Sequence, residues 1–349
     1  MQNGTVESQE EDAKKEAHNL EAVRALKSQH LIKAIGYYSL GSKHCFLFPL
    51  AEHKNLWYFW VARIEERKRG RSHRGDNKFL VWVFTQLVGI ADAVAELHGD
   101  VPNIRHGDLK PENILCFQNG SCVQDTGDLT EPPIRMVITD VGISKGHQGP
   151  TQRRAVTSTV VSTARYEPPE MDQTKESPGH PKLSRRYDVW SLGCILLEFL
   201  IWLLYDSEGL LNFTNTLKER FYESNKKGPQ IHPTVSQWIK KIKNDKTNCR
   251  EGTPFRDLVV LIEEKLLVVK VETLPETLSE VAPTESNKIP LLRKLGVTRA
   301  LRKTLTQQAS DKFAEMVGRR RASAKDMRDE LGKILEHIKR QKFEVKRGG

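Results

Sequence analysis

Apolar residues recur at helical spacing in three stretches of the chain. Residues 78–97 carry apolar side chains around most of a helical circumference, and residues 188–204 form a mostly apolar run with Glu198 near its middle. Helices that are apolar on several sides are buried on several sides. Both stretches therefore predict core helices, and we expect Glu198 to be paired there or to extend toward solvent, without a catalytic role. Residues 13–26 show one apolar stripe (Ala17, Leu20, Val23 and Leu26), which predicts an amphipathic helix.

Shorter apolar runs predict strands. Residues 31–38 and 45–50 flank a Gly-Ser-Lys turn and predict a β-hairpin. Residues 114–117 and 135–138 are two further strand-like runs, separated by a polar loop. Asn55 precedes another apolar stretch and is placed to cap a helix. The chain after the second core helix is expected to be mostly helical.

Composition narrows the class of protein. The 349 residues are 38% hydrophobic and 29% charged, which is typical of a globular protein with one large domain or two ordinary ones. The net charge is +10, with basic clusters at residues 63–74, 319–321 and 339–347. We interpret these clusters as solvated surface and expect no nucleic-acid partner.

Cysteine usage and the N-terminus suggest a location in the cell. The five cysteines are scattered without metal-binding spacing, and the acidic N-terminus has no apolar core typical of a secretory signal. We therefore expect reduced thiols and a cytoplasmic protein, or a nuclear one if the basic C-terminal stretch acts as a localisation signal. The apolar run at residues 188–204 is short and carries a charge, so no membrane association is expected. Oligomeric state is left open.

The run from Arg105 to Asn113 carries candidate chemistry on one short loop between the first core helix and a strand. A carboxylate at Asp108 can orient a hydroxyl group and accept its proton. The cation of Lys110, two residues further on, can reach a phosphate group that this hydroxyl would attack. Asn113 can bind Mg2+ through its amide oxygen. Phosphoryl transfer needs positioning and charge neutralisation more than covalent chemistry, so this set of residues predicts a phosphotransferase.

The loop His106-Gly107-Asp108-Leu109-Lys110-Pro111-Glu112-Asn113 resembles the catalytic loop of the eukaryotic serine/threonine protein kinase superfamily, with Gly107 in place of an arginine. Asp140-Val141-Gly142 stands where that family has Asp-Phe-Gly. Residues 162–170, which end in Pro168-Pro169-Glu170, resemble its substrate-docking loop. Residues 188–193 resemble the helix that anchors the catalytic loop, and residues 321–324 resemble a late segment whose arginine pairs with the docking-loop glutamate.

The resemblance implies a role for each matching residue. Asp108 would be the base, Lys110 the phosphate contact, and Asn113 and Asp140 the ligands of the Mg2+ that accompanies ATP. Structural support would come from five residues: His106, Thr163, Glu170, Asp188 and Arg321.

Upstream, residues 16–32 resemble the family's regulatory helix running into its fourth strand, and residues 46–52 resemble its fifth strand and hinge. By that alignment Glu16 is the helix glutamate, Phe48 is the gatekeeper, and the backbone of Pro49 and Ala51 faces adenine. The segments Asn-Leu-Glu-Ala-Val-Arg and Phe-Pro-Leu-Ala-Glu are similar to the corresponding sequences of a group of fungal kinase-domain proteins.

The sequence also departs from the family. A glycine-rich loop and a Val-Ala-x-Lys strand are absent, so the first three strands of the N-lobe are missing. Either the sequence is a truncated product or gene model of a longer kinase, or it is a kinase-like protein that binds ATP poorly. Gly107 implies activity that depends less on phosphorylation of the loop containing Thr157, Ser158 and Thr159.

Three functions remain in competition. Transfer of the γ-phosphate of ATP to serine or threonine hydroxyls of a protein substrate, with Mg2+, is the expected one. A pseudokinase acting as a binding or scaffold module is the alternative. The third is a small-molecule phosphotransferase of the aminoglycoside type. Those enzymes also carry a His-Gly-Asp-Leu sequence in this loop, but they lack the Pro-Pro-Glu segment.

The expected fold class is α+β, a protein-kinase-like two-lobe fold with a truncated β N-lobe and a mostly helical C-lobe. Residues 1–12 are expected to form a disordered leader, residues 13–338 the kinase domain and residues 339–349 a basic tail. Within the domain, residues 13–51 would be the partial N-lobe and residues 52–338 the C-lobe.

Overall fold

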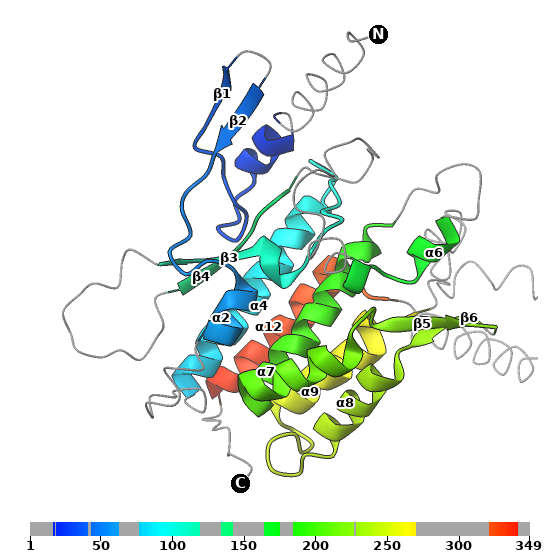
Figure 1. The fold of residues 1–349 in the computed structure, drawn as a ribbon. Helices are drawn as coiled ribbons and strands as arrows, with labels where there is room; N and C mark the ends of the chain where they lie inside the picture. Colours follow the sequence, from blue (N-terminus) through cyan, green and yellow to red (C-terminus); the bar gives the residue numbers. More distant parts are fainter. Residues whose placement is uncertain are drawn as a thin grey trace, which may run out of the picture.

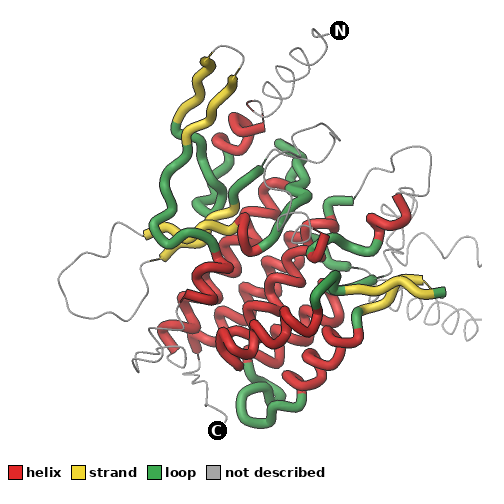
Figure 2. The backbone as a smooth tube through the Cα atoms, viewed as in Figure 1, coloured by secondary structure: helices red, strands yellow, loops and turns green. Residues whose placement is uncertain are grey.

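The structure is a computed structural model of the protein. It describes residues 17, 19–40, 43–62, 77–118, 134–141, 164–174, 184–226, 228–269 and 321–340. Helices make up most of these residues, and three two-stranded sheets lie around them (Figures 1 and 2).

The core is built on three long helices, α4 (Asn77–Leu97), α7 (Arg186–Leu217) and α12 (Ala324–Arg340). Figure 1 shows α12 between α4 and α7, although it comes from the end of the chain. Met327 and Leu331 of α12 are fully buried. Shorter helices surround this centre: α2 (Leu56–Ala62), α8 (Pro233–Lys243), α9 (Pro254–Leu261) and the π-helical turn η3 (Ile262–Leu266).

The two predicted core helices are confirmed. Almost every residue of α7 up to Leu203 is buried, and α4 buries residues on most of its faces. Both helices are long and apolar enough to cross a membrane by length and composition alone. Within the fold, however, 94% of the apolar window of α7 and 61% of that of α4 are buried, as in a core helix.

Helix α7 runs further than predicted and consists of two helical parts that meet at a kink at Asp206. Asp206 has φ 67°, a left-handed conformation that side chains rarely adopt. At the kink, Ser207 Oγ donates a hydrogen bond to the carbonyl of Trp60 at 2.6 Å, and Trp202 Nε1 donates to the same carbonyl at 3.1 Å. These bonds satisfy a carbonyl near the C-terminal end of α2 and attach α2 to the kink.

The start of α2 follows the predicted cap. Asn55 Oδ1 accepts a hydrogen bond from the backbone N–H of Tyr58 at 2.9 Å. Trp60 and Phe59 of α2 are buried, and the ring of Trp60 meets Phe199 of α7 edge-on at a centroid distance of 5.5 Å. The amphipathic stripe near the N-terminus is also present, since residues 19–25 are helical and Leu20 and Val23 are buried.

The first hairpin is displaced from its prediction. Strand β1 (Gly36–Leu40) pairs antiparallel with β2 (Lys43–Leu47), so the first strand begins later and the second ends earlier than expected. Leu31 instead forms a parallel bridge with Ile138, and the N–H of Ile32 donates to the carbonyl of Ile138 at 2.8 Å. Leu31 and Ile32, which were predicted to begin the first strand of the hairpin, are buried against β4 instead.

The two further strand-like runs are confirmed as strands, and the structure pairs them. Strand β3 (Ile114–Gln118) pairs antiparallel with β4 (Ile134–Ile138). A third hairpin was not predicted. Strand β5 (Tyr222–Asn225) pairs with β6 (Gly228–Ile231). Figure 1 shows this hairpin beside the short helix α6 (Glu170–Thr174).

Candidate functional site

The predicted catalytic loop lies between α4 and β3. Its path is fixed at both ends, because the N–H of Ile104 donates to the carbonyl of Leu97 at 2.7 Å and the N–H of Asn113 donates to that of Lys110 at 2.9 Å. Residues Pro111–Asn113 form a single 3-10 turn, which Pro111 starts with its fixed φ. The turn leads directly into β3.

Asp108 is held by two other residues of the loop. Lys110 Nζ lies 3.1 Å from Asp108 Oδ2, and Asn113 Nδ2 donates to the backbone carbonyl of Asp108 at 2.8 Å and to Oδ2 at 3.2 Å. The side chain of Asp108 is 24% exposed, whereas that of Lys110 is 7% exposed. The loop therefore presents a carboxylate toward solvent with an ammonium group and an amide behind it.

Asp188, at the start of α7, anchors the backbone of the catalytic loop. Its fully buried carboxylate accepts the backbone N–H groups of His106 and Gly107, each at 2.8 Å, and His98 Nε2 lies 2.7 Å from Oδ2. Burial opposes the charged form, but the hydrogen bond and charge of His98, with help from His106 and the Gly107 N–H, hold the pKa of Asp188 below its usual value. Gly107 has φ 75°, a conformation that glycine adopts without strain.

His106 ties the loop to the end of β4. Its Nε2 donates to the carbonyl of Thr139 at 2.8 Å, and its Nδ1 accepts the N–H of Asp108 at 3.3 Å. The N–H of Thr139 in turn donates to the carbonyl of Asn113 at 2.9 Å. These bonds bring the residue after Thr139, Asp140, to the loop.

Asp140 is an exposed residue with φ 60°. Although the residue as a whole is exposed, protein atoms around its carboxylate partly desolvate it; this desolvation and the charge of Asp108 raise the pKa of Asp140, while His106 and Lys110 act in the opposite direction. The structure thus brings Asp108, Lys110, Asn113 and Asp140 into one neighbourhood.

The donors Asn113 and Asp140 fit Mg2+ chemically. An amide oxygen and a carboxylate are hard oxygen ligands, which Mg2+ prefers. Among the described residues no group of three or more His, Cys, Asp or Glu side chains could hold a metal ion. A Mg2+ ion here would take its remaining ligands from phosphate groups and water.

The predicted docking loop is described from Ala164 onward. Glu170, at the start of α6, receives two parallel hydrogen bonds from the fully buried guanidinium of Arg321, at 2.7 and 3.1 Å. Ser191 Oγ of α7 donates to the carbonyl of Tyr166 at 2.8 Å. The structure therefore brings the predicted bracing residues together and packs the loop against α7.

Glu198 is paired, as predicted, and its partners come from the same docking loop. Tyr166 donates its hydroxyl to Glu198 Oε2 at 2.8 Å, and Arg165 Nε lies 3.6 Å from Oε1. Complete burial is the largest effect on this carboxylate, and it raises the pKa to about 7 despite Arg165 and Tyr166.

The predicted hinge residues follow β2. Phe48 is 38% exposed and Pro49 is also exposed, while Ala51 is half-buried against a small apolar cluster of Ile32, Phe117 and Val137. Glu16 and Thr163 lie outside the described residues, as do Gly142, Thr157, Ser158 and Thr159.

Two residues near the site were missed. Leu115 of β3 packs on the same small cluster as Ala51, which makes it a candidate contact for the adenine ring of a nucleotide. Its signal was weak, because alternation along a short strand does not separate a lining residue from a core residue. His98 carries no recognisable motif, and nothing in its local sequence indicates the bond to Asp188, 90 residues away.

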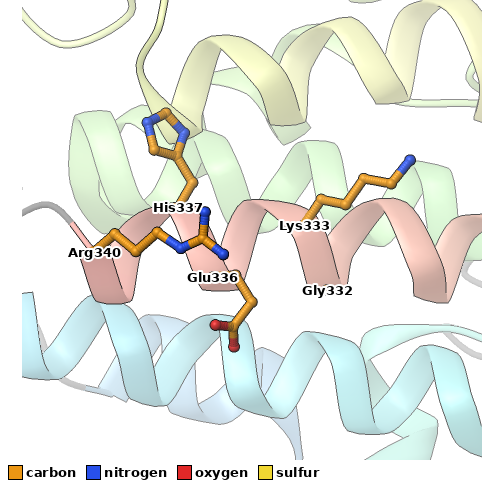
Figure 3. Close-up of a pocket in the computed structure, with 5 residues that line it drawn as sticks. All are labelled: Gly332, Lys333, Glu336, His337 and Arg340. Carbon is orange, nitrogen blue, oxygen red and sulfur yellow. The ribbon is translucent and has the colours of Figure 1, made fainter.

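A surface pocket of about 560 Å3 lies elsewhere, along α12 (Figure 3). Its described lining residues are Gly332, Lys333, Glu336, His337 and Arg340. In Figure 3, Lys333 and His337 point away from Glu336, and His337 Nδ1 is 3.3 Å from Asp257 of α9. The pocket contains none of the predicted site residues, so the candidate site stays at the loop around Asp108.

Comparison with known proteins gives the family. The model of the protein kinase domain matches residues 2–254. The chain is 24% identical over 226 residues to a probable serine/threonine-protein kinase of Dictyostelium discoideum, which covers 62% of this chain and 18% of that protein. It is 29% identical over 201 residues to serine/threonine-protein kinase tousled-like 2 of Mus musculus, covering 54% and 24%. With serine/threonine-protein kinase nekl-2 of Caenorhabditis elegans it shares 25% over 213 residues, covering 61% and 50%.

The chain thus spans between 18% and 50% of the length of these three curated relatives. The matched residues contain the loop around Asp108, Asp140, the docking loop and the first part of the helical core. They carry the two-lobe architecture of the family, with which the small sheets and many helices of the structure are compatible. By this match over more than half of its length, the chain belongs to the protein kinase domain family, within the eukaryotic serine/threonine protein kinase superfamily.

Proposed function

We propose that this chain transfers the γ-phosphate of ATP to serine or threonine hydroxyl groups of a protein substrate. The observation that carries the proposal is the arrangement of Asp108, whose carboxylate is 24% exposed and is fixed by Lys110 and Asn113 on a loop anchored to Asp188. Family membership supports the same reaction class.

Each residue takes a role that its chemistry allows. Asp108 orients the acceptor hydroxyl and takes up its proton, and Lys110 contacts the phosphate that is transferred. Asn113 and Asp140 would hold Mg2+, which supplies positive charge against the phosphate oxygens when bound. His106 and Asp188 keep the loop in place through backbone hydrogen bonds.

On the nucleotide side, we propose that Phe48, Pro49, Ala51 and Leu115 border adenine. Support comes from the small apolar cluster on which Ala51 and Leu115 pack, since two of its members, Phe117 and Val137, belong to the strand pair that leads to Asp140. The reaction would take place in the cytoplasm or the nucleus, on a protein partner.

A second candidate is a pseudokinase that acts as a binding or scaffold module. The observation in its favour is that the sequence has no Val-Ala-x-Lys strand and no glycine-rich loop, which in the family hold the phosphates of ATP. A longer parent protein would supply both. The choice between the two functions therefore depends on measured turnover.

Phosphate transfer from radiolabelled ATP to a generic acceptor protein tests the proposal. We expect wild-type protein to transfer phosphate and Asp108→Asn to lose the transfer by at least about a hundredfold, the usual contribution of a positioned base. Asp100→Asn, an exposed aspartate in the turn after α4, is the matched control and should be unchanged. Equal transfer by wild type and Asp108→Asn would reject the catalytic assignment.

A thermal-shift measurement with Mg-ATP separates binding from turnover. Wild type and Asp108→Asn should both melt at a higher temperature with Mg-ATP, because a ligand that binds only the folded state stabilises it. Asp140→Asn should show a smaller shift. A shift without transfer by wild type supports the pseudokinase, and no shift in any variant rejects nucleotide binding by this chain.

A further inference from the structure

The docking loop is held from a second side by residues that the proposed reaction does not use. Arg220 lies between the end of α7 and β5, 48 residues beyond its partner Asp172 in α6. Its guanidinium donates to Asp172 Oδ1 at 2.7 Å and approaches Glu167 Oε2 at 3.4 Å. One arginine thus contacts carboxylates on both sides of the Pro168-Pro169 pair.

Tyr222, the first residue of β5, completes the contact. Its hydroxyl accepts a hydrogen bond from Arg220 at 2.6 Å and donates one to Asp172 Oδ2 at 2.8 Å. The ring of Tyr222 is buried and meets Trp190 of α7 edge-on at a centroid distance of 6.1 Å. Because the ring is fixed in the core, its hydroxyl restrains the side chains of Arg220 and Asp172 to one position.

The two arginines that hold the docking loop differ in their surroundings. Arg321 is fully buried and reaches Glu170 from inside the fold, whereas the side chain of Arg220 is 25% exposed and reaches the loop from the β5–β6 side. Asp172 is 37% exposed. Hydrogen bonds to Asp172 and the charges around it outweigh partial burial and raise the pKa of Arg220, so the contact stays charged.

We propose that Arg220, with Tyr222, is a positioning residue that fixes the docking loop for the acceptor protein. The inference rests on the proposed kinase function. Arg220 touches neither Asp108 nor Asp140 in the described contacts, so its effect would fall on the binding of the acceptor and not on ATP. Its partly exposed side chain links α6 to the residues just before β5, and Figure 1 shows α6 and the β5–β6 hairpin in the same region of the fold.

Steady-state kinetics with the full chain test the proposal, with dephosphorylated casein and myelin basic protein as separate acceptors. In Arg220→Gln we expect KM for both acceptors to rise about three- to tenfold, the effect of a partly exposed charge-assisted hydrogen bond. KM for Mg-ATP should change by less than about twofold, because the substitution weakens the binding of the acceptor protein and leaves the binding of ATP unaffected. Arg220→Lys should recover part of the loss, and Tyr222→Phe should show a smaller rise.

The matched control is Arg328→Gln. Arg328 of α12 is 32% exposed and pairs with Asp92 of α4 at 3.0 Å and with Asp329 at 2.7 Å, so it has the same kind of contacts without the docking loop. A second check is Asp172→Asn combined with Arg220→Gln. The double variant should raise KM no further than Arg220→Gln alone, because the two residues act through one contact.

Hydrogen exchange of residues 164–174 gives a readout independent of activity. Exchange there should rise in Arg220→Gln and stay unchanged in Arg328→Gln. If wild type transfers no phosphate, the proposed function fails, and exchange alone decides whether Arg220 fixes the loop. Unchanged KM in an active enzyme, unchanged exchange of the loop, or the same changes in Arg328→Gln would each overturn the proposal. A uniform rise in exchange over the whole fold would also overturn it, since Arg220 would then serve stability only.

Discussion

Arg321 and Glu170 form a two-pronged ion pair, at 2.7 and 3.1 Å, between residues 151 positions apart in the chain. The guanidinium is fully buried, and it also donates to the carbonyls of Val268 and Arg186. The plane of the guanidinium lies over the ring of Trp190, with 5.0 Å from its central carbon to the ring centroid. This pair joins the docking loop to the start of the last described segment, which lies beyond the residues matched by the family.

Removing the charge of Glu170 should therefore be costly. Glu170→Gln leaves a buried guanidinium without its counter-ion, and we expect the free energy of unfolding to fall by about 3–5 kcal/mol. Urea denaturation measures the loss. Glu330→Gln breaks an exposed pair with Lys333 and should cost less than about 1 kcal/mol. Equal losses in the two variants would contradict the role of the buried pair.

Asp188→Asn should loosen the catalytic loop. An amide in place of the carboxylate cannot accept both backbone N–H groups of His106 and Gly107 together with His98, so we expect a loss of about 2–3 kcal/mol. Hydrogen exchange at residues 106–108 should rise with it. Asp245→Asn is the control, because Asp245 accepts the N–H groups of Thr247 and Asn248, each at 3.0 Å, in a turn far from the site. Unchanged exchange at residues 106–108 in Asp188→Asn would refute the anchoring role.

Stability should depend on pH through Glu198. Its pKa is raised from 4.5 to about 7 in the folded state, so the folded protein holds a proton that the unfolded chain releases near pH 4.5. This contribution is fully present below pH 4.5 and is lost as pH rises through about 7. A shift of this size corresponds to ~3 kcal/mol.

Urea denaturation between pH 4 and 8 checks this dependence. Glu198→Gln keeps the shape of the protonated form and should flatten the fall in stability between pH 4.5 and 7. Glu336 is an exposed residue whose pKa is lowered by its pairing with Lys339, so Glu336→Gln should leave the fall unchanged in that window. If Glu198→Gln and wild type have parallel profiles, another group causes the dependence.

Two helical glycines should respond oppositely to alanine. A Cβ at Gly193 of α7 would lie 2.9 Å from Leu266 Cβ and 3.1 Å from Leu267 Cδ2, so Gly193→Ala should cost about 1–3 kcal/mol. A Cβ at Gly332 of α12 would meet nothing within 4 Å, and Gly332→Ala should stabilise by up to about 1 kcal/mol. Urea denaturation of both variants measures the difference. Stabilisation by Gly193→Ala would show that α7 and η3 are not in close contact.

The long periodic elements were predictable because their signals are local. The apolar circumference of residues 78–97 and the short apolar runs of β3 and β4 are features of neighbouring residues, and the structure follows both. The hairpin near the N-terminus was less predictable. Leu31 and Ile32 have the composition of a strand, but they are used for contacts with Ile138 in another part of the fold. A short apolar run does not indicate which partner will bury it.

The candidate site divides in the same way. The sequence by itself determined the order and chemistry of Asp108, Lys110, Asn113 and Asp140, because the first three stand on one short loop and Asp140 directly follows a strand-like run. Only the tertiary structure decided that His98 bonds to Asp188, that α7 has a kink at Asp206, and that Arg220 joins Glu167 to Asp172. The bonds of His98 and Arg220 join residues between 48 and 90 positions apart. Their partners are chosen when helices and hairpins pack, and packing depends on the shape of the whole core.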